Sequence, residues 1–96
     1  MNAKFSPGQV VATPGALDAL AASGQTNDFF LEKHLSGDWG EVDAEDQNAN
    51  DQALADGGRL LSSYRTLRGV VVWVLTEAEG DDGQRASTCL TTPEEY

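Results

Sequence analysis

The chain has 96 residues, with 16 acidic against six basic side chains and a formal net charge of −10. This length suits one domain, over residues 1–96, with a single modest hydrophobic core. Direct binding to nucleic acid or to an anionic membrane needs clustered Lys and Arg, so the composition argues against both. The single Cys excludes an internal disulfide and an all-Cys metal site, and is typical of a reducing compartment.

The sequence predicts neither a membrane span nor a cofactor. No apolar run approaches the roughly 18 residues that cross a bilayer, and residues 1–5 do not begin a signal peptide. No glycine pattern matches a nucleotide-binding loop, and one His with scattered acids matches no metal motif. We therefore expect a cytoplasmic protein without a cofactor.

The N-terminal third predicts a strand and a helix. Residues 9–13 form a short apolar run, which is long enough for one strand. A first helix begins after Thr13, a good N-cap, with Pro14 in its first turn where the missing N–H costs nothing. The helix is expected to end at Gly24.

Two more helices follow, separated by a glycine-bounded turn. The second begins at a cap on Thr26 or Asn27 and ends near Ser36. In the turn 37–40, Trp39 lies between two glycines, and we expect so large a side chain to fill the core from there. The third helix begins after an N-cap at Asp43 and ends at the glycine pair 57–58. Its thin apolar content predicts a surface helix with one narrow contact stripe.

From residue 59 the apolar period changes from about 3.6 to 2, which indicates strands over 60–66, 70–78 and 85–92. The second strand is apolar on both faces and is therefore expected to be central. Short connections predict antiparallel pairing. The expected fold class is α+β, with a short N-terminal strand, three helices and then a three-stranded antiparallel β-meander. Residues 93–96 are predicted to be a tail.

The most unusual feature is an acidic band without a single base. Its members are Asp38, Glu41, Asp43, Glu45, Asp46, Asp51 and Asp56. One interpretation is a solvated face that keeps a small protein soluble. The other is a footprint for a basic protein surface, which we expect here. In helical spacing Asp43, Asp46 and Asn50 would share one exposed face, with Asp51 beside it.

A rival interpretation is a small enzyme or ligand-binding domain with a polar pocket around His34, Asp38, Tyr64 and Glu77. A lone His is more often a packed core side chain than a catalytic base, so we expect a binding role rather than catalysis. Cys89 is interpreted as a buried structural thiol, because nothing local would lower its pKa.

Segments 11–17, 34–40, 58–64 and 73–78, with the ending 90–96, together resemble a family of small "plasmid-related" proteins of plasmids, integrative elements and phages. Gly-Asp-Trp-Gly and Leu-Leu-Ser-Ser-Tyr are the most specific parts. The resemblance brings no catalytic residues with it. It implies an accessory protein of a mobile element, a class that often blocks host defence such as restriction or CRISPR systems. The expected partner is a basic protein or a ribonucleoprotein, and the expected oligomeric state is a monomer or a weak homodimer.

Overall fold

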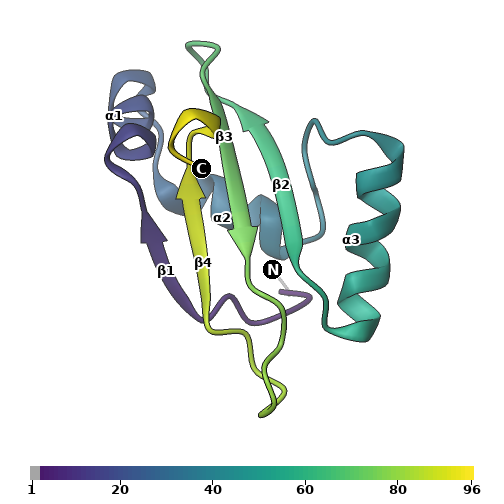
Figure 1. Cartoon of the computed structure of the whole chain (residues 1–96). Coiled ribbons are helices and arrows are strands. Elements are labelled where there is room, and N and C mark those ends of the chain that lie inside the picture. The colour runs from purple at the N-terminus through teal and green to yellow at the C-terminus, as the bar shows by residue number, and fades with distance from the viewer. Residues whose placement is uncertain (1–2) are drawn as a thin grey trace.

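The computed structural model describes residues 3–96 and contains one four-stranded sheet with three helices (Figure 1). In chain order the elements are β1 (Gln9–Ala12), α1 (Pro14–Ser23), α2 (Asn27–Leu35), α3 (Ala44–Asp56), β2 (Leu60–Arg65), β3 (Val71–Thr76), β4 (Ser87–Thr91) and a single 3-10 turn, η1 (Pro93–Glu95). The predicted α+β class and the number of helices are confirmed.

The sheet has the strand order β1-β4-β3-β2, so the predicted three-stranded antiparallel meander is wrong. β2, β3 and β4 do pair antiparallel, and β3 is flanked on both sides as expected. However, β1 adds a fourth strand parallel to β4, with Val11 beside Cys89. The amide of Thr13 donates to the Leu90 carbonyl at 2.9 Å. The chain from α1 to β3 supplies the long connection that a parallel pair requires.

The helix ends follow from their capping residues as predicted. The Thr13 and Asp43 side chains accept from the amides three residues later, and Thr26, not Asn27, caps α2. α1 and α3 end at Gly24 and Gly57, both of which have positive φ.

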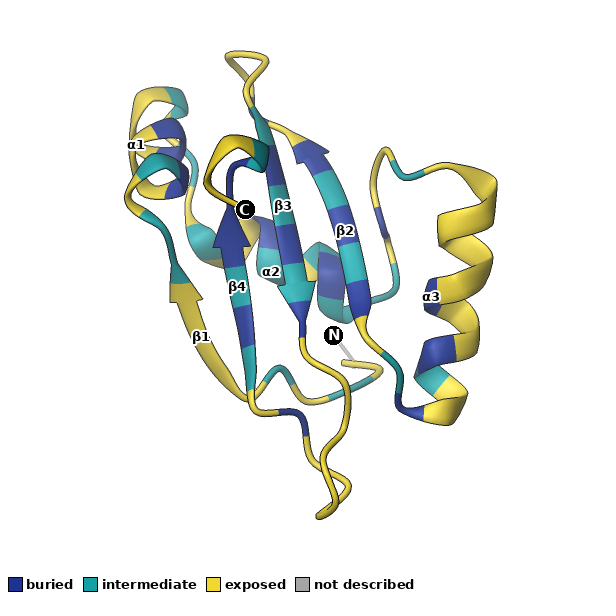
Figure 2. Cartoon of the chain, viewed as in Figure 1, coloured by how far each residue is buried: buried dark blue, intermediate teal, exposed yellow. Residues whose placement is uncertain are grey.

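The core lies between one face of the sheet and the helices α1 and α2; α2 is seen behind the sheet in Figure 2, and α1 lies at the upper left, above β1. Alternate residues of β2 and β3 are buried on this face, as the period of two requires. Phe30 of α2 stacks on Tyr64 at 5.3 Å between ring centroids. Ser62 is buried and Ser63 is half-buried, so the two neighbours point to opposite faces as expected.

The outer edge of β2 is closed by side-chain and loop contacts instead of another strand. The Asn50 amide of α3 donates to the Leu61 carbonyl at 2.7 Å and accepts from the Leu61 amide at 3.1 Å. Residues 39–41 pair with Ser63 in the same way. Gly40 has a φ of 75°, and an added Cβ would meet the Ser63 carbonyl, so only glycine allows this approach. The closed edge cannot recruit another strand.

The predicted C-terminal tail is instead an ordered part of the fold. η1 packs on β3 across the face of the sheet opposite α1 and α2 (Figure 1). The Glu95 carboxylate accepts from the Thr13 hydroxyl at 2.6 Å and from the Gly15 amide at 2.9 Å, at the start of α1. These bonds, with others from Thr92, lower the pKa of Glu95 to about 2. The prediction of a tail was wrong because the contacts that order η1 come from residues near the other end of the chain, which the local sequence of residues 93–96 does not reveal.

Candidate functional site

The acidic band occupies the turn after α2 and the whole of α3, beside the β2 edge (Figure 2). All seven of its carboxylate residues are exposed. The rest of the chain carries nine acids against six bases, so the band supplies seven of the ten net negative charges. The negative charge of the protein is therefore concentrated on one flank of the fold.

α3 is attached to the fold by a narrow stripe, which was predicted. Its buried residues are Asn50 and Ala53, and Leu54 is half-buried. The expectation that Asn50 shares an exposed face with Asp43 and Asp46 is wrong. Its two hydrogen bonds to Leu61 turn it toward the sheet, while the acids remain on the solvent side.

Several band carboxylates are fixed in place by hydrogen bonds through one oxygen. Asp51 accepts from the indole Nε1 of Trp39 at 3.0 Å. Asp43 accepts from the Asp46 amide at 2.8 Å, and Asp56 accepts from the Gly58 amide at 3.0 Å. A surface whose side chains are already ordered loses less conformational entropy when a partner binds.

Two basic side chains form ion pairs at the margin of the acidic band. Arg65 contacts Glu41 at 3.2 Å and Lys33 contacts Asp38 at 3.6 Å, and these are the two ion pairs of the described residues. All four side chains are well exposed, so each pair contributes little to stability and leaves most of the band's charge uncompensated.

The buried polar network is centred on His34, which has no exposed surface. Its Nδ1 lies 2.5 Å from Ser62 Oγ, and its Nε2 lies 2.8 Å from Thr76 Oγ1. Thr76 Oγ1 is 2.7 Å from Thr88 Oγ1, which donates to the Pro7 carbonyl at 2.8 Å. The network therefore crosses the sheet from β2 to the segment before β1.

The Pro7 carbonyl, which can only accept, fixes the direction of the bonds from Thr88 to His34 Nε2. The lowered pKa of the buried imidazole keeps it neutral at pH 7, and this fixes the bond with Ser62. Thr88 gives its proton to Pro7, so Thr76 must donate to Thr88. Thr76 Oγ1 then accepts from His34 Nε2–H, and the Ser62 hydroxyl donates to the free Nδ1. The imidazole is thus a neutral Nε2–H tautomer with both nitrogens satisfied.

Burial, together with the positive charge of Arg85, lowers the pKa of His34 from 6.5 to about 4. The Ser62–His34 pair has the distance of a nucleophile and a general base, but both side chains are fully buried. A substrate has no access to the pair, so the network ties the core together instead of supporting catalysis.

The four residues of the rival pocket do not come together. His34 bonds to Ser62 and Thr76, not to Asp38. The Tyr64 hydroxyl donates to the Asp38 main-chain carbonyl at 2.5 Å, while the Asp38 carboxylate accepts from the Gly40 amide. Glu77 is exposed just beyond the end of β3. His34 and Asp38 are close in the sequence, and Tyr64 and Glu77 lie on or just beyond neighbouring strands of the sheet. This nearness does not bring the four side chains into one pocket.

Cys89 is half-buried on the open face of the sheet, so the prediction of a buried thiol is wrong in degree. Its partial desolvation and the nearby Glu95 raise the thiol pKa, which keeps it protonated and unreactive. The sequence could not reveal that η1 and Tyr96 lie across this face and leave Cys89 at the side of a shallow hollow.

Within residues 3–96, no cluster of His, Cys, Asp and Glu is arranged to hold a metal ion. None of the helices described is long and apolar enough to cross a membrane. Comparisons with protein-family models, with curated proteins and with solved structures find no match to this chain.

Proposed function

We propose that the protein is a non-enzymatic binding module that docks on a basic protein or ribonucleoprotein through the acidic band. The observation that supports this most is the concentration of seven exposed carboxylates, without one base, in the segment 38–56. Four of them lie on α3, a helix whose buried contacts come from Asn50, Ala53 and Leu54. The helix dipole does not account for all of this charge, because Asp51 and Asp56 lie toward the end of α3 where the dipole disfavours acids.

The size of the band fits a protein partner. A helix of 13 residues is about 20 Å long. Such a stripe spans a modest protein interface and speeds association with a basic surface at low ionic strength. Together with the resemblance to plasmid-related proteins, this favours an accessory protein of a mobile element that inhibits a host nucleic-acid-targeting defence complex by occupying its basic surface.

The test is a variant that neutralises the four band acids of α3 while keeping their hydrogen bonds: Glu45→Gln, Asp46→Asn, Asp51→Asn and Asp56→Asn. An Asn oxygen still accepts from Trp39 and from the Gly58 amide, so the fold is expected to persist by circular dichroism. In pull-downs from a bacterial lysate over a salt series, we expect the variant to lose the partners that the parent retains.

The matched control neutralises four exposed acids outside the band: Asp18→Asn, Glu32→Gln, Asp81→Asn and Glu94→Gln. Both variants remove four charges from the parent's −10, so they differ in position and not in net charge. The control is expected to keep the partners at the same salt resistance. Equal loss in both variants, or no loss in either, would mean that the band only confers solubility.

A second expected result is that the protein does not bind duplex DNA. At −10 its approach to a polyanion is repulsive, and its six bases are scattered along the chain. Fluorescence anisotropy of a labelled duplex should show no binding even at low salt. Saturable binding that weakens as salt rises would contradict this expectation.

A further inference from the structure

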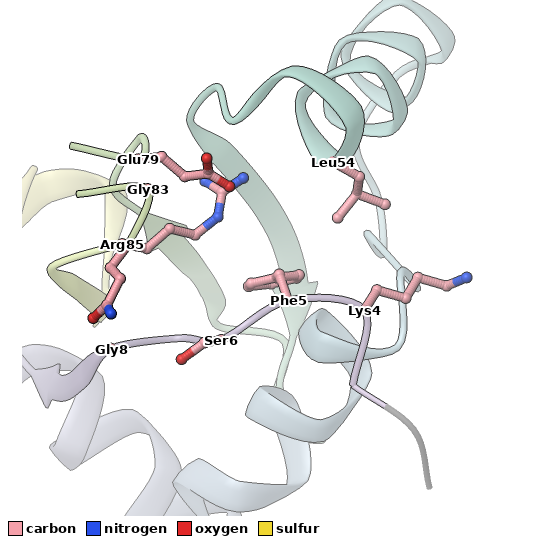
Figure 3. A pocket seen from close by; sticks show the side chains of 9 residues that line it. Lys4, Phe5, Ser6, Gly8, Leu54, Glu79, Gly83 and Arg85 are labelled. Carbon is pink, nitrogen blue, oxygen red and sulfur yellow. The ribbon is translucent and has the colours of Figure 1, made fainter. Parts of the chain in front are cut away.

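A hollow of about 460 Å³ lies between α3, the N-terminal segment and the loop that joins β3 to β4 (Figure 3). Its walls come from residues 4–8, from the last turns of α3 and from the loop between β3 and β4. Phe5 and Leu54 give it apolar surface, and Lys4, Glu79 and Arg85 give it charge. Its volume falls in the range of cavities that hold small organic ligands.

The guanidinium of Arg85 is held rigidly in the wall of this hollow, and the residue is only 7% exposed. Its Nη1 donates to the carbonyls of Gly58 at 2.6 Å and Glu77 at 3.0 Å, and its Nη2 donates to the Ala53 carbonyl at 3.2 Å. These bonds use three of its five N–H groups. The Nε–H and one Nη2–H have no acceptor among the described residues.

Among the described residues Arg85 has no partner at ion-pair distance, although the Glu79 carboxylate lines the same hollow. Its three acceptors are neutral carbonyls, and neither ion pair of the described residues includes it. The free N–H groups of a guanidinium form charge-assisted hydrogen bonds with an anion that can reach them. Two of the chain's six bases line this hollow, against one acid, Glu79, although the protein as a whole is strongly acidic.

The apolar part of the hollow adjoins the guanidinium directly. The Phe5 ring lies 5.6 Å from the Arg85 guanidinium carbon, and Phe5 also packs with Leu54 in one cluster with Trp39. Gly8 allows the N-terminal segment to pass this close, because its φ is 66° and an added Cβ would meet the Arg85 carbonyl. A planar cation beside an aromatic ring is an arrangement suited to an anion with a flat apolar body.

We propose that this hollow binds a small organic carboxylate, with its carboxylate on the free N–H groups of Arg85 and its apolar body against Phe5 and Leu54. The guanidinium matches the planar geometry of a carboxylate. The site shares no residue with the acidic band, so it is independent of the proposed protein partner.

The test compares benzoate with benzamide, which has nearly the same shape but no charge, by NMR titration of the backbone amides. Benzoate is expected to produce saturable shifts at residues 4–8 and 79–85, with a Kd on the order of 1 mM for so small a ligand. Benzamide should produce none there. Equal responses to the two compounds, or no saturable response to benzoate, would overturn the proposal.

Substitutions of Glu79 provide a test that leaves the contacts of Arg85 intact. Glu79→Gln removes the one repelling carboxylate of the hollow and is expected to tighten benzoate binding several-fold. Glu94→Gln, on η1, makes the same change in net charge outside the hollow and should leave binding unchanged. Equal effects of the two substitutions would contradict the site.

Arg85→Lys keeps the charge but loses the planar donors, and is expected to weaken benzoate binding about tenfold.

Discussion

Replacing Trp39 with Ala is expected to lower the free energy of unfolding by about 3–5 kcal/mol, the usual cost of truncating a buried Trp. The side chain is only 5% exposed and fills the space between α3 and the sheet, with Ala53 and Leu60. Its ring also contacts those of Phe5 and His34. A domain of this size has a total stability of only about 5–15 kcal/mol, so the variant should be close to unfolding.

The measurement is urea unfolding of the parent and the variant, supported by a thermal melt in which Tm should fall by about 12 °C or more. Trp73→Ala is the matched control for removing an indole. Trp73 is half-buried on the open face, edge-on to Tyr96 at 5.7 Å, so its loss should cost less. If Trp39→Ala unfolded at the urea concentration of the parent, the turn 37–40 would not belong to the core.

Local signals predicted most of the elements because their causes are local. Thr13 and Asp43 cap helices through contacts three residues away, and Gly57 ends α3 by adopting a positive φ. The size of Trp39 was enough to predict its burial. The strand assignments were too long at their ends, as for β3, which covers Val71–Thr76 within the predicted 70–78.

The errors concern contacts between residues far apart in the chain. The parallel pairing of β1 with β4 joins residues 9–12 to 87–90, and an apolar run cannot specify its neighbour. Glu95 likewise binds the start of α1, where its hydrogen-bond partner Thr13 is 82 positions away in the sequence. The His34 network joins α2 to three strands through Ser, Thr and His residues that are ordinary in sequence.

The surface exposure of the acidic band could be predicted from the sequence, but the contacts that support the band could not. All seven acids of the band are exposed: four on a surface helix, where periodicity and charge set their placement, and three in the turn and N-cap before it. The sequence could not indicate that Asn50 would be buried as a substitute for a neighbouring strand. It also gave no sign of the hollow at Arg85, since a lone Arg after a glycine-rich turn has no recognisable spacing.

Mild acid is expected to destabilise the protein through His34. The unfolded chain takes up a proton at this side chain near pH 6.5, whereas the folded protein resists protonation until about pH 4. Between these values the unfolded chain binds more protons, so stability rises with pH and is fully present above 6.5. The free energy of unfolding should fall by about 3 kcal/mol as the pH drops from 6.5 to 4.

The mechanism can be observed directly because the chain has one His. The imidazole NMR signals of the folded protein should not move between about pH 8 and about pH 5, where an ordinary His titrates. Titration of the folded protein near pH 6.5 would contradict the burial of His34. Glu95 contributes in a lower window, because its lowered pKa makes its stabilisation disappear only as the pH falls from 4.5 toward about 2.

His34→Gln separates the imidazole from the many carboxylates that also respond to acid. A Gln amide can accept from Ser62 and donate to Thr76, as the neutral imidazole does, but it does not titrate. The variant loses the ring contacts with Phe5 and Trp39 and should be less stable than the parent at neutral pH. Urea unfolding over a pH series should then show a parent curve that approaches that of the variant as the pH falls from 6.5 to 4. A constant difference between the curves would mean that His34 contributes only packing to the fold.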